Sequence, residues 1–369
     1  MERKLTILDI ARIAGVSKST VSRVLNQHAR VNPETRERIL HVIAEHDFAP
    51  SLNAKGLRGQ SQLIGMLVPA LSWSLILESI QGIAQVAERS AYEIILYSFM
   101  ANKDFSDVLD RVMATRLTAG LLAMLQTQST AHLLELYRQG IPIVLVNNIG
   151  LRTELPLVVA DNYGGAYQAV RYLTSLGHRR IAYISGPFSL PCAHDRYQGY
   201  CAALKDVGLT PDPALFQQGR FEIVSGRAST EALLELAEPP TAIFAANDEM
   251  AYGVLDVAKM HGLRVPEDLS VIGFDDIAPS ASTHPALTTI RQPFREMGQC
   301  AAELLLSLLD AQRPLSADWQ KFAIDYRPEP VASLGREQAD PLQIQLPTEL
   351  IVRETCGLAS TASSQAILS

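Results

Sequence analysis

The stretch "VSKSTVSRVLN", residues Val16 to Asn26, lies near the start of a 369-residue chain whose formal net charge is −7. With Ser17 as a helix N-cap and a step of about 100° per residue, one arc holds only polar side chains, Lys18, Ser19, Ser22 and Arg23. The opposite arc holds the mostly apolar residues Thr20, Val21, Val24 and Leu25. The stretch is therefore predicted to be a short helix that docks by one side and presents hydrogen-bonding groups on the other.

Two further helical patterns flank this segment. In "TILDIARIAG", Thr6 is a suitable N-cap, and Gly15 stands where a helix would end in a left-handed conformation. In "NPETRERILHVIAEHDF", Asn32 is a suitable N-cap and Pro33 occupies the first helical position. Two helices joined by a tight glycine turn, with a third as a brace, predict a three-helix helix-turn-helix domain over residues 1–50.

The rest of the chain has the pattern of an α/β protein. After the polar stretch "APSLNAKGLRGQSQ", strand-like apolar runs alternate with amphipathic helical stretches, the runs being 63–68, 93–98, 120–125, 142–146, 158–160, 180–185, 241–245 and 270–274. Such alternation predicts parallel sheets in α/β units. Because the series restarts after about residue 160, two sheets in two subdomains fit better than one large sheet.

These patterns suggest approximate domain boundaries. Residues 51–61 form a linker with a single helical piece, and residues 62–357 form the body. We place the N-terminal subdomain at about 62–160 and 292–315, and the C-terminal subdomain at about 161–290 and 341–357. Residues 316–340, with Trp319, Phe322 and Tyr326, are expected to be an inserted hairpin or surface loop. The tail, 358–369, lacks the apolar heptads of a tetramerisation helix.

The composition is that of a globular protein, with 47% hydrophobic and 19% charged residues. No apolar run approaches the roughly 18 to 20 residues that a bilayer requires, and the N-terminus lacks a signal core, so we expect a cytoplasmic protein with no membrane contact. The cysteines form no C-x-x-C pair, which argues against a zinc ribbon, a redox motif or a disulfide framework; they are Cys192, Cys201, Cys300 and Cys356. We expect neither a metal site nor a cofactor.

Charge is distributed unevenly along the chain. Residues 1–60 contain ten Lys or Arg and six Asp or Glu, whereas the remaining 309 residues contain 22 and 33. This asymmetry is typical of a small nucleic-acid-binding domain attached to an acidic body.

Eight stretches together resemble the lactose/galactose-repressor family of bacterial transcription regulators. In chain order they are "TILDIARIAGVSKSTVSRVLN", "VNPETRERIL", "LGHRRIAYISGP", "DRYQGY", "FAANDEMAYGVL", "VPEDLSVIGFDD", "HPALTTIRQP" and "LPTELIVRE". The resemblance implies a body like that of periplasmic binding proteins, with a small-molecule effector bound between its subdomains. It also implies a homodimeric repressor that binds double-stranded palindromic operator DNA.

In that family the second helix enters the major groove of the operator. By motif position Lys18, Ser19 and Arg23 would face base edges, and the forked donors of Arg23 match the two acceptors of guanine. Phosphate contacts would come from Thr6, Ser17, Thr20, Ser22 and Asn26. The alternative is that Thr6 and Ser17 are only helix caps and Arg23 is a solvated charge. A helix N-terminus aimed at a phosphate satisfies both interpretations of the caps.

The linker resembles the family's hinge helix, which inserts a leucine into the minor groove and kinks the duplex. Leu57 matches that leucine, and Ala54 matches the small residue that lets paired helices approach. Gly56 lies inside the helical piece, where glycine costs about 1 kcal/mol relative to alanine. Hinge folding should therefore depend strongly on subunit pairing. The alternative is that Leu57 is an ordinary interface leucine.

The effector is expected in the cleft between the subdomains, outside the carboxyl ends of the strands. Sugars are bound by planar amides and carboxylates, with an aromatic ring against their C–H face. The matching positions are Ser72, Trp73, Asn147, Arg196, Phe221, Asn247 and Asp275. Arg196 and Asp275 are expected to converge there. The alternatives are that Asn247 only caps the following helix, that Trp73 is a core residue, and that Asp275 has a structural role.

Two departures from the family pattern bear on the effector. Leu190 and Cys192 stand where the purine-repressor branch carries an arginine and a threonine, and "SWSLI" replaces the common "SNPFF". A neutral mono- or disaccharide, or a close derivative, is therefore favoured. The protein is expected to repress a carbohydrate-utilisation operon and to be released from DNA by this effector. The alternatives are a corepressor-dependent regulator of the purine type and a sugar-binding protein without a DNA role. No G-x-S-x-G, P-loop, G-x-G-x-x-G or H-E-x-x-H motif occurs, so an enzyme is not expected.

Overall fold

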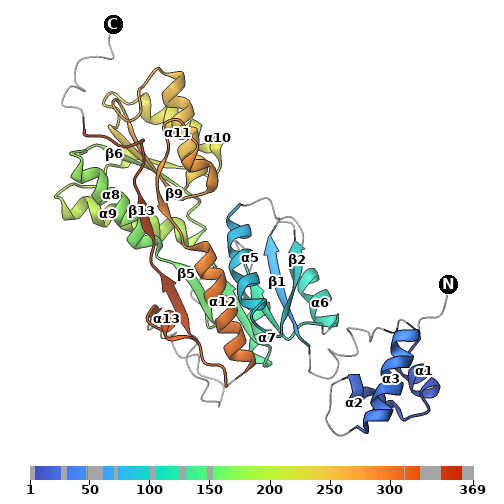
Figure 1. The fold of residues 1–369 in the computed structure, drawn as a ribbon. Coiled ribbons are helices and arrows are strands. Elements are labelled where there is room, and N and C mark those ends of the chain that lie inside the picture. Colours follow the sequence, from blue (N-terminus) through green and yellow to red (C-terminus); the bar gives the residue numbers. More distant parts are fainter. Residues whose placement is uncertain are drawn as a thin grey trace. The chain divides into compact units, whose positions relative to one another are not determined.

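The chain divides into two compact units. In the computed structural model, shown as a ribbon in Figure 1, they are Met1–Gln62 with Asp110–Ala119, and Leu63–Leu109 with Gly120–Ser369. The structure describes residues 5–25, 31–46, 48, 61–69, 74–99, 105–115, 117–124, 130–147, 153–310, 312–324 and 342–359. Among these residues no helix is long and apolar enough to cross a membrane.

The first unit contains the three predicted helices, α1 (Ile7–Ile13), α2 (Lys18–Leu25) and α3 (Pro33–Glu45). Thr6 caps α1 in a capping box: its backbone N–H donates to the Asp9 carboxylate, and its hydroxyl accepts from the Asp9 N–H. Gly15 has a φ of +64°, so the chain turns between α1 and α2 at a residue without a Cβ atom. Asn32 caps α3 by accepting from the Glu34 N–H at 2.9 Å. These local signals are confirmed as predicted.

A small core joins the three helices, formed by buried residues that include Ile10, Val21, Val24, Ile39 and Val42. Burying each such side chain contributes roughly 1.5 to 3 kcal/mol to the stability of the folded unit. This packing fixes the orientation of the short helix α2. The apolar side of α2 is thus used inside the unit, and its other side faces solvent.

The second unit contains two sheets. The first has seven strands in the order β11-β12-β5-β4-β3-β1-β2, and the second has six in the order β13-β10-β9-β8-β6-β7. All neighbours pair in parallel except β11 with β12 and β13 with β10. The strands are β1 (Leu63–Pro69), β2 (Glu93–Phe99), β3 (Gly120–Ala123), β4 (Ile143–Val146), β5 (Leu157–Ala160), β6 (Ile181–Ser185), β7 (Phe216–Gln218), β8 (Ala242–Ala245), β9 (Ser270–Asp275), β10 (Thr288–Arg291), β11 (Ala323–Ile324), β12 (Gln343–Leu346) and β13 (Glu349–Ile351). The prediction of two mostly parallel sheets is confirmed.

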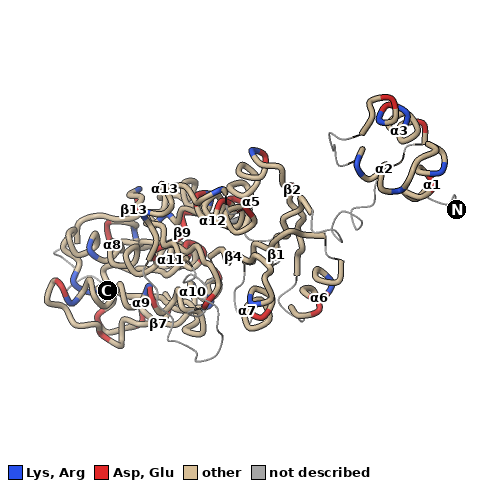
Figure 2. The backbone as a smooth tube through the Cα atoms, turned by 90° about the horizontal axis from the view of Figure 1, so that it is seen from below, with Lys and Arg blue, Asp and Glu red and all other residues tan. Residues whose placement is uncertain are grey.

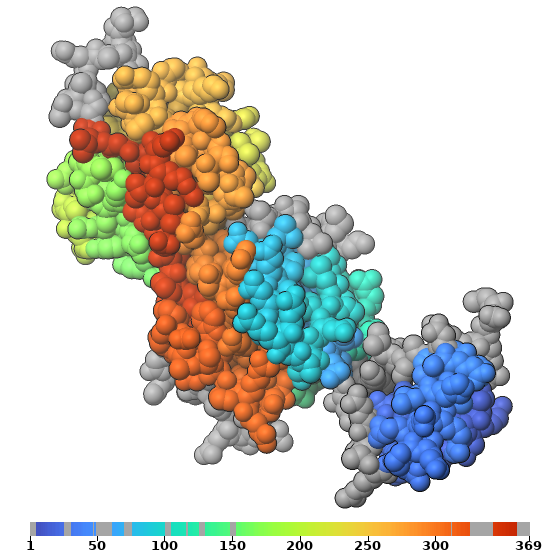
Figure 3. All heavy atoms as spheres, viewed as in Figure 1, coloured from blue at the N-terminus to red at the C-terminus, as the bar shows by residue number. Residues whose placement is uncertain are grey.

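Helices cover both sheets, and close helix pairs are α5 with α12, α8 with α9, and α10 with α11. Figure 3 shows α12 in orange beside α5 in cyan. The helices are α5 (Ser74–Ala87), α6 (Phe105–Thr115), α7 (Ala131–Arg138), α8 (Asn162–Ser175), α9 (Pro191–Asp206), α10 (Ile223–Leu234), α11 (Asp248–Met260), α12 (Phe294–Leu309) and α13 (Ala317–Gln320). Two short 3-10 helices are η1 (Pro213–Leu215) and η2 (Ala278–Ala281).

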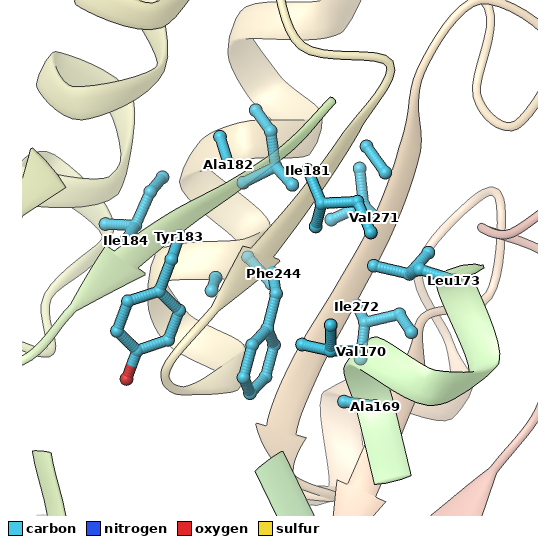
Figure 4. Close-up of a cluster of buried hydrophobic side chains, with 14 of the residues drawn as sticks. Ala169, Val170, Leu173, Ile181, Ala182, Tyr183, Ile184, Phe244, Val271 and Ile272 are labelled. Carbon is cyan, nitrogen blue, oxygen red and sulfur yellow. The ribbon is translucent and has the colours of Figure 1, made fainter. Parts of the chain in front are cut away.

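Each sheet and the helices packed on it form a separate buried core. In the second, Tyr183 of β6 and Phe244 of β8 are fully buried with ring centroids 5.2 Å apart. Figure 4 shows the Phe244 ring among Tyr183, Val170 and Ile272. Strands buried on both faces read as continuous apolar runs, which is why the sequence predicted most of them.

Three segments cross between the sheets. The chain leaves the first sheet after β5, returns to it between β10 and α12, and crosses again at Pro347–Thr348 between β12 and β13. The sequence placed residues 341–357 with the C-terminal subdomain. The structure differs here, because β12 pairs in parallel with β5 of the first sheet and only β13 joins the second.

The first part of the inserted segment also belongs to the first sheet. Ala323 of β11 pairs with Ile344 of β12, and Trp319 and Phe322 pack against the first core. Tyr326 lies outside the described residues.

Close packing of α5 against α12 depends on two glycines. A Cβ atom on Gly298 would overlap the backbone carbonyl oxygen of Ser79, and one on Gly82 would overlap that of Arg295. Although alanine is the better helix former, Gly298→Ala should lower the free energy of unfolding in urea by about 1 to 3 kcal/mol. Glu296→Ala, at an exposed position of α12, is the control and should change it by no more than about 0.5 kcal/mol. Stabilisation by Gly298→Ala would contradict the packing argument.

Candidate functional site

The exposed side of α2 is the first candidate site. Of the residues predicted to contact DNA, Ser17, Lys18, Ser19 and Arg23 are exposed, whereas Thr20 and Ser22 are half-buried. Figure 2 marks the basic residues of α1 to α3 in blue. This side therefore presents two cations and several hydroxyls over a helix whose other side is fixed by Val21 and Val24.

Three hydroxyls gather at the N-terminus of α2. The Ser17 Oγ lies 2.7 Å from the Ser19 Oγ and 2.8 Å from the Thr20 Oγ1, and it accepts from the Thr20 N–H at 3.2 Å. The cap role and an outward hydroxyl role are thus compatible for Ser17. Thr6, in contrast, donates its hydroxyl to Asp9 within the capping box. Asn26, Ala54 and Leu57 lie outside the described residues.

The second candidate site lies at the carboxyl ends of strands in the second unit. Asp275 ends β9, Asn247 begins the turn from β8 into α11, and Phe221 follows β7. Among the described residues, four that are not glycine have positive φ: Asn147 (48°), Phe221 (62°), Asp275 (115°) and Asp276 (59°). Three of these four were singled out from the sequence. Such conformations cost of order 1 to 3 kcal/mol each and concentrate at binding sites.

Arg196 is the centre of this site. It is 5% exposed, and its guanidinium lies 3.7 Å from the centroid of the Phe274 ring and 5.9 Å from that of Phe221. Its Nε donates to Asn162 Oδ1 at 2.9 Å, and its Nη1 donates to the carbonyl of Ala246. The Phe274 ring and these two hydrogen bonds therefore fix one orientation of the guanidinium and of its charge.

Arg196 and Asp275 converge, as the sequence predicted. Their Nη2 and Oδ1 atoms are 3.5 Å apart, and the same Oδ1 accepts from Gln292 Nε2 at 2.5 Å. Burial raises the pKa of Asp275 to about 6, although the Arg196 charge and the Gln292 hydrogen bond act to lower it. At neutral pH the pair carries little net charge, and the carboxylate keeps acceptor capacity for a polyhydroxyl ligand.

Asn247 caps α11, and this cap does not decide whether it also contacts the effector. Its side-chain oxygen caps α11 by accepting from the Met250 N–H at 3.0 Å, and its Nδ2 donates to the Phe221 carbonyl at 3.2 Å. It is 7% exposed. Asn247 therefore fixes the backbone of Phe221, a residue in a strained conformation, and this positioning role does not depend on a bound ligand.

One of the remaining predicted residues lies on the first sheet. Asn147 directly follows β4 of the first sheet and is half-buried. Ser72 and Trp73 lie outside the described residues. The structure thus brings together Arg196, Phe221, Asn247 and Asp275.

Asn162 and Gln292 were not singled out from the sequence, although both contact the central pair. Asn162 opens α8 directly after β5 and its crossing, and Gln292 follows β10 on another crossing. A polar side chain directly after a strand is the signal that would have indicated Asn162. A cavity of about 820 Å³ adjoins Asp275 and Gln292 and extends to Leu77, Arg295 and Thr348. The second candidate site therefore touches the segments that join the two sheets.

Asp248, next to Asn247, is fully buried behind the site. Its Oδ2 accepts from the Ile277 N–H at 2.9 Å and from the Ser280 hydroxyl at 2.6 Å, and its Oδ1 accepts from the Thr289 hydroxyl. Burial raises the pKa of Asp248 to about 8, and the nearby Asp275 acts in the same direction. Asp248 thereby ties η2 and β10 to the start of α11.

This raised pKa predicts a pH-dependent stability. Between about pH 4 and 8 the folded protein binds a proton at Asp248 that the unfolded chain has lost, so the free energy of unfolding should fall as pH rises, by at most about 1.4 kcal/mol per unit. Asp248→Asn lacks this titration and keeps the bonds, because its oxygen accepts from Ile277 and Ser280 while its amide donates to Thr289. Urea unfolding at pH 5, 6, 7 and 8 should show that the free energy of unfolding of the variant, relative to that of the wild type, increases at each higher pH. If the free energies of unfolding of wild type and variant changed in parallel with pH, the assignment of this titration to Asp248 would be contradicted. Asp256→Asn, at an exposed ion pair, is the control.

Among the described residues no cluster of three or more His, Cys, Asp or Glu side chains is arranged to hold a metal ion. The second candidate site is built from the side chains around Arg196 and from backbone with positive φ at Phe221 and Asp275.

Comparisons with known proteins show two family matches along the chain. Residues 6–51 match the family model described as "Bacterial regulatory proteins, lacI family", and residues 170–321 match that of a periplasmic binding protein-like domain. The chain is 35% identical over 310 residues to catabolite control protein A of Priestia megaterium, covering 84% of this chain and 93% of that protein. It is 36% identical over 316 residues to the HTH-type transcriptional repressor CytR of Escherichia coli strain K12, covering 84% and 92%.

Solved structures show the same architecture. The lac repressor dimer bound to operator and the anti-inducer ONPF matches with a TM-score of 0.77 at 28% identity, covering 96% of this chain and 100% of that one. A complex of the transcriptional regulator CelR with cellobiose matches with a TM-score of 0.67 at 28% identity, covering 95% and 99%. Both of these solved structures are of regulatory proteins, a repressor and a transcriptional regulator.

Proposed function

This chain belongs to the LacI family of bacterial regulatory proteins, and we propose that it is a repressor of a carbohydrate-utilisation operon controlled by a sugar. The observation that carries the proposal is the exposed polar side of α2, with Lys18, Ser19 and Arg23 over a buried apolar side. Lys18, Ser19 and Arg23 read base edges, and the hydroxyls of Ser17, Thr20 and Ser22 contact phosphates. Thr6 and Asn26 are proposed as further phosphate contacts.

A homodimer with paired hinges is part of the proposal. Two copies of α2 would read two half-sites of a palindrome about one helical turn apart. Residues 51–61 would form the hinge, with Leu57 inserted into the minor groove and Ala54 at the contact between hinges. The lac repressor dimer bound to its operator supports this arrangement by similarity.

The effector is proposed to bind against Arg196, Phe221, Asn247 and Asp275, with Asn147, Ser72 and Trp73 contributing from the N-terminal subdomain. A sugar is favoured because paired charges and an aromatic ring suit vicinal hydroxyls. Leu190 is apolar, and Cys192 is 4% exposed, with burial raising the pKa of its thiol to about 12. Neither supplies a hydrogen-bond donor of the kind that a purine ring would need. A complex of one relative with cellobiose supports the same choice.

Control of DNA binding then follows from the crossings. A ligand that binds one arrangement of the two sheets more tightly shifts the population toward it, and only this differential affinity can change operator affinity. We propose that the sugar releases the repressor from DNA.

Two measurements test the proposal. Full-length protein is used to select duplexes from a random library, and a palindromic sequence should be enriched. Calorimetry is then run with neutral sugars, sugar phosphates, nucleosides and nucleobases, and a neutral sugar should bind and weaken the complex with the selected duplex. Absence of an enriched palindrome would refute the repressor, whereas binding of a nucleobase with no bound sugar would favour the purine-type alternative.

A further inference from the structure

Asp276 lies directly after the proposed effector residue Asp275, but its side chain contacts other partners. We propose that Asp276 is a positioning residue, which holds the strained end of β9 and couples Asp275 to two of the crossings between the sheets. The coupling role rests on the effector role proposed above for Asp275. The contacts of Asp276 themselves do not depend on it.

The Asp276 carboxylate is held by two arginines. Its Oδ2 accepts from Arg291 Nε at 2.7 Å, and its Oδ1 accepts from Arg353 Nη2 at 2.6 Å. The carboxylate side chain is 7% exposed, and that of Arg353 is 17% exposed. The side chain of Arg291 is 49% exposed, so the pair with Arg353 is the more buried of the two. An ion pair with a buried carboxylate and short hydrogen bonds holds its geometry more firmly than a pair that is exposed on both sides.

Both arginines are anchored to strands that meet the crossings. Arg353 donates from Nη1 to the Leu287 carbonyl at 2.7 Å, and its backbone N–H donates to the Thr288 hydroxyl at 2.9 Å. Arg291 is the last residue of β10, and its Nη1 also lies 3.4 Å from the Glu349 carboxylate at the start of β13. The Asp276 carboxylate therefore links the end of β9 to the end of β10 through Arg291, and to the segment after β13 through Arg353.

Two consecutive aspartates thus contact two consecutive residues at the point where β10 ends and the crossing to α12 begins. Asp276 binds Arg291, and Asp275 accepts from Gln292, the next residue toward α12. Both aspartates have positive φ, which the chain keeps only where its surroundings enforce it. A movement of this crossing would therefore displace both carboxylates. A ligand bound to Asp275 would act on the crossing through the same contacts.

An ion cluster that only stabilises the fold would have different consequences. Its loss would loosen the whole unit together, or only the backbone next to Asp276. A positioning residue instead predicts that residues 273–279 and 347–353, which are separated by about 70 residues in the chain, lose protection together while the rest stays unchanged.

Hydrogen–deuterium exchange on the full-length protein separates these outcomes. Asp276→Asn keeps the side-chain shape and tolerates positive φ, but it removes the charge that binds both arginines. Arg353→Met removes one partner. In both variants we expect amides of 273–279 and 347–353 to exchange at least five-fold faster, with α10 and α11 unchanged, and the double variant should stay within two-fold of Asp276→Asn. Asp256→Asn, at the exposed ion pair with Arg227, is the matched control and should leave all peptides unchanged.

Acceleration confined to 273–279, or spread over the whole unit with a matching fall in Tm, would overturn the proposal. Multiplicative effects of the two single variants would overturn it as well. A second comparison uses the duplex selected by the wild type and the sugar that weakens that complex. The ratio of duplex affinities without and with this sugar should fall at least five-fold in Asp276→Asn. If the wild type selects no duplex, the repressor function fails, and the exchange rates still decide the role of Asp276.

Discussion

Replacing Arg23 by alanine is expected to lower the affinity for the selected palindrome by at least about 30-fold. A bidentate contact to guanine contributes roughly 1 to 3 kcal/mol of discrimination, and a dimer loses one in each half-site. Arg23 is exposed on α2, while the buried side of that helix holds Val21 and Val24, so the substitution leaves the small core intact. Random duplex should lose much less affinity, and the preferred base at one position of each half-site should become degenerate.

Arg12→Ala provides the charge-matched control for this measurement. Arg12 is on α1, its side chain is 80% exposed, and its only charged partner among the described contacts is Asp9 at 3.3 Å. Its removal should weaken palindromic and random duplexes by the same factor, because only the electrostatic attraction of phosphates is lost. If Arg23→Ala behaved in the same way, Arg23 would be a solvated charge and not a base contact.

Replacing Arg196 by methionine is expected to abolish sugar binding and to destabilise the second unit by about 3 to 5 kcal/mol. Removing one partner of a buried ion pair leaves the other charge uncompensated, which is where this magnitude comes from. The pKa of Asp275, already raised by burial, should rise further without the cation beside it. The free energy of unfolding is measured in urea, and sugar affinity is measured by calorimetry.

Asp275→Asn tests the same site with a smaller change in the side chains around it. Asparagine leaves the buried Arg196 cation without its counter-charge, but it keeps the side-chain shape and an acceptor oxygen for Arg196 and Gln292. Arg196 also keeps its bonds to Asn162 and Ala246, so the loss of stability should be smaller than in Arg196→Met, which removes all of these contacts. Sugar affinity should still fall at least ten-fold. Arg227→Met, at an exposed ion pair, is the control and should cost no more than about 1 kcal/mol with unchanged sugar binding. Full sugar affinity in Asp275→Asn would place the binding site elsewhere.

Local signals made much of the fold predictable. Thr6, Gly15 and Asn32 mark helix ends by chemistry that acts within a few residues, and buried parallel strands stand out as apolar runs. The strands β7, β10, β12 and β13 have three or four residues each and were not predicted. Their pairing depends on distant neighbours, as when β12 takes its place beside β5, and no local pattern encodes that choice.

The site was predictable in its residue types and less so in its contacts. Arg196 of α9 and Asp275 at the end of β9 were assigned to the site by the family resemblance and were expected to converge because of their opposite charges, and their convergence is confirmed. The dual hydrogen bonding of Asn247 was not decidable from the sequence, because a cap and a ligand contact use the same amide. The Arg196 bond to Asn162 and the Asp276 bonds to both arginines join residues 15 to 77 positions apart, which only the folded chain reveals.

The three crossings also constrain how this protein is made on the ribosome. The first sheet needs β12 and the second needs β13, so the first lacks a strand until synthesis has passed residue 346, and the second until it has passed residue 351. The early-made strand β5 must wait, with one edge unpaired, for β12 near the end of the chain. Nascent chains halted before residue 342 should consequently stay sensitive to protease and attractive to chaperones, while the first three helices, whose small core is local, can fold as soon as they emerge.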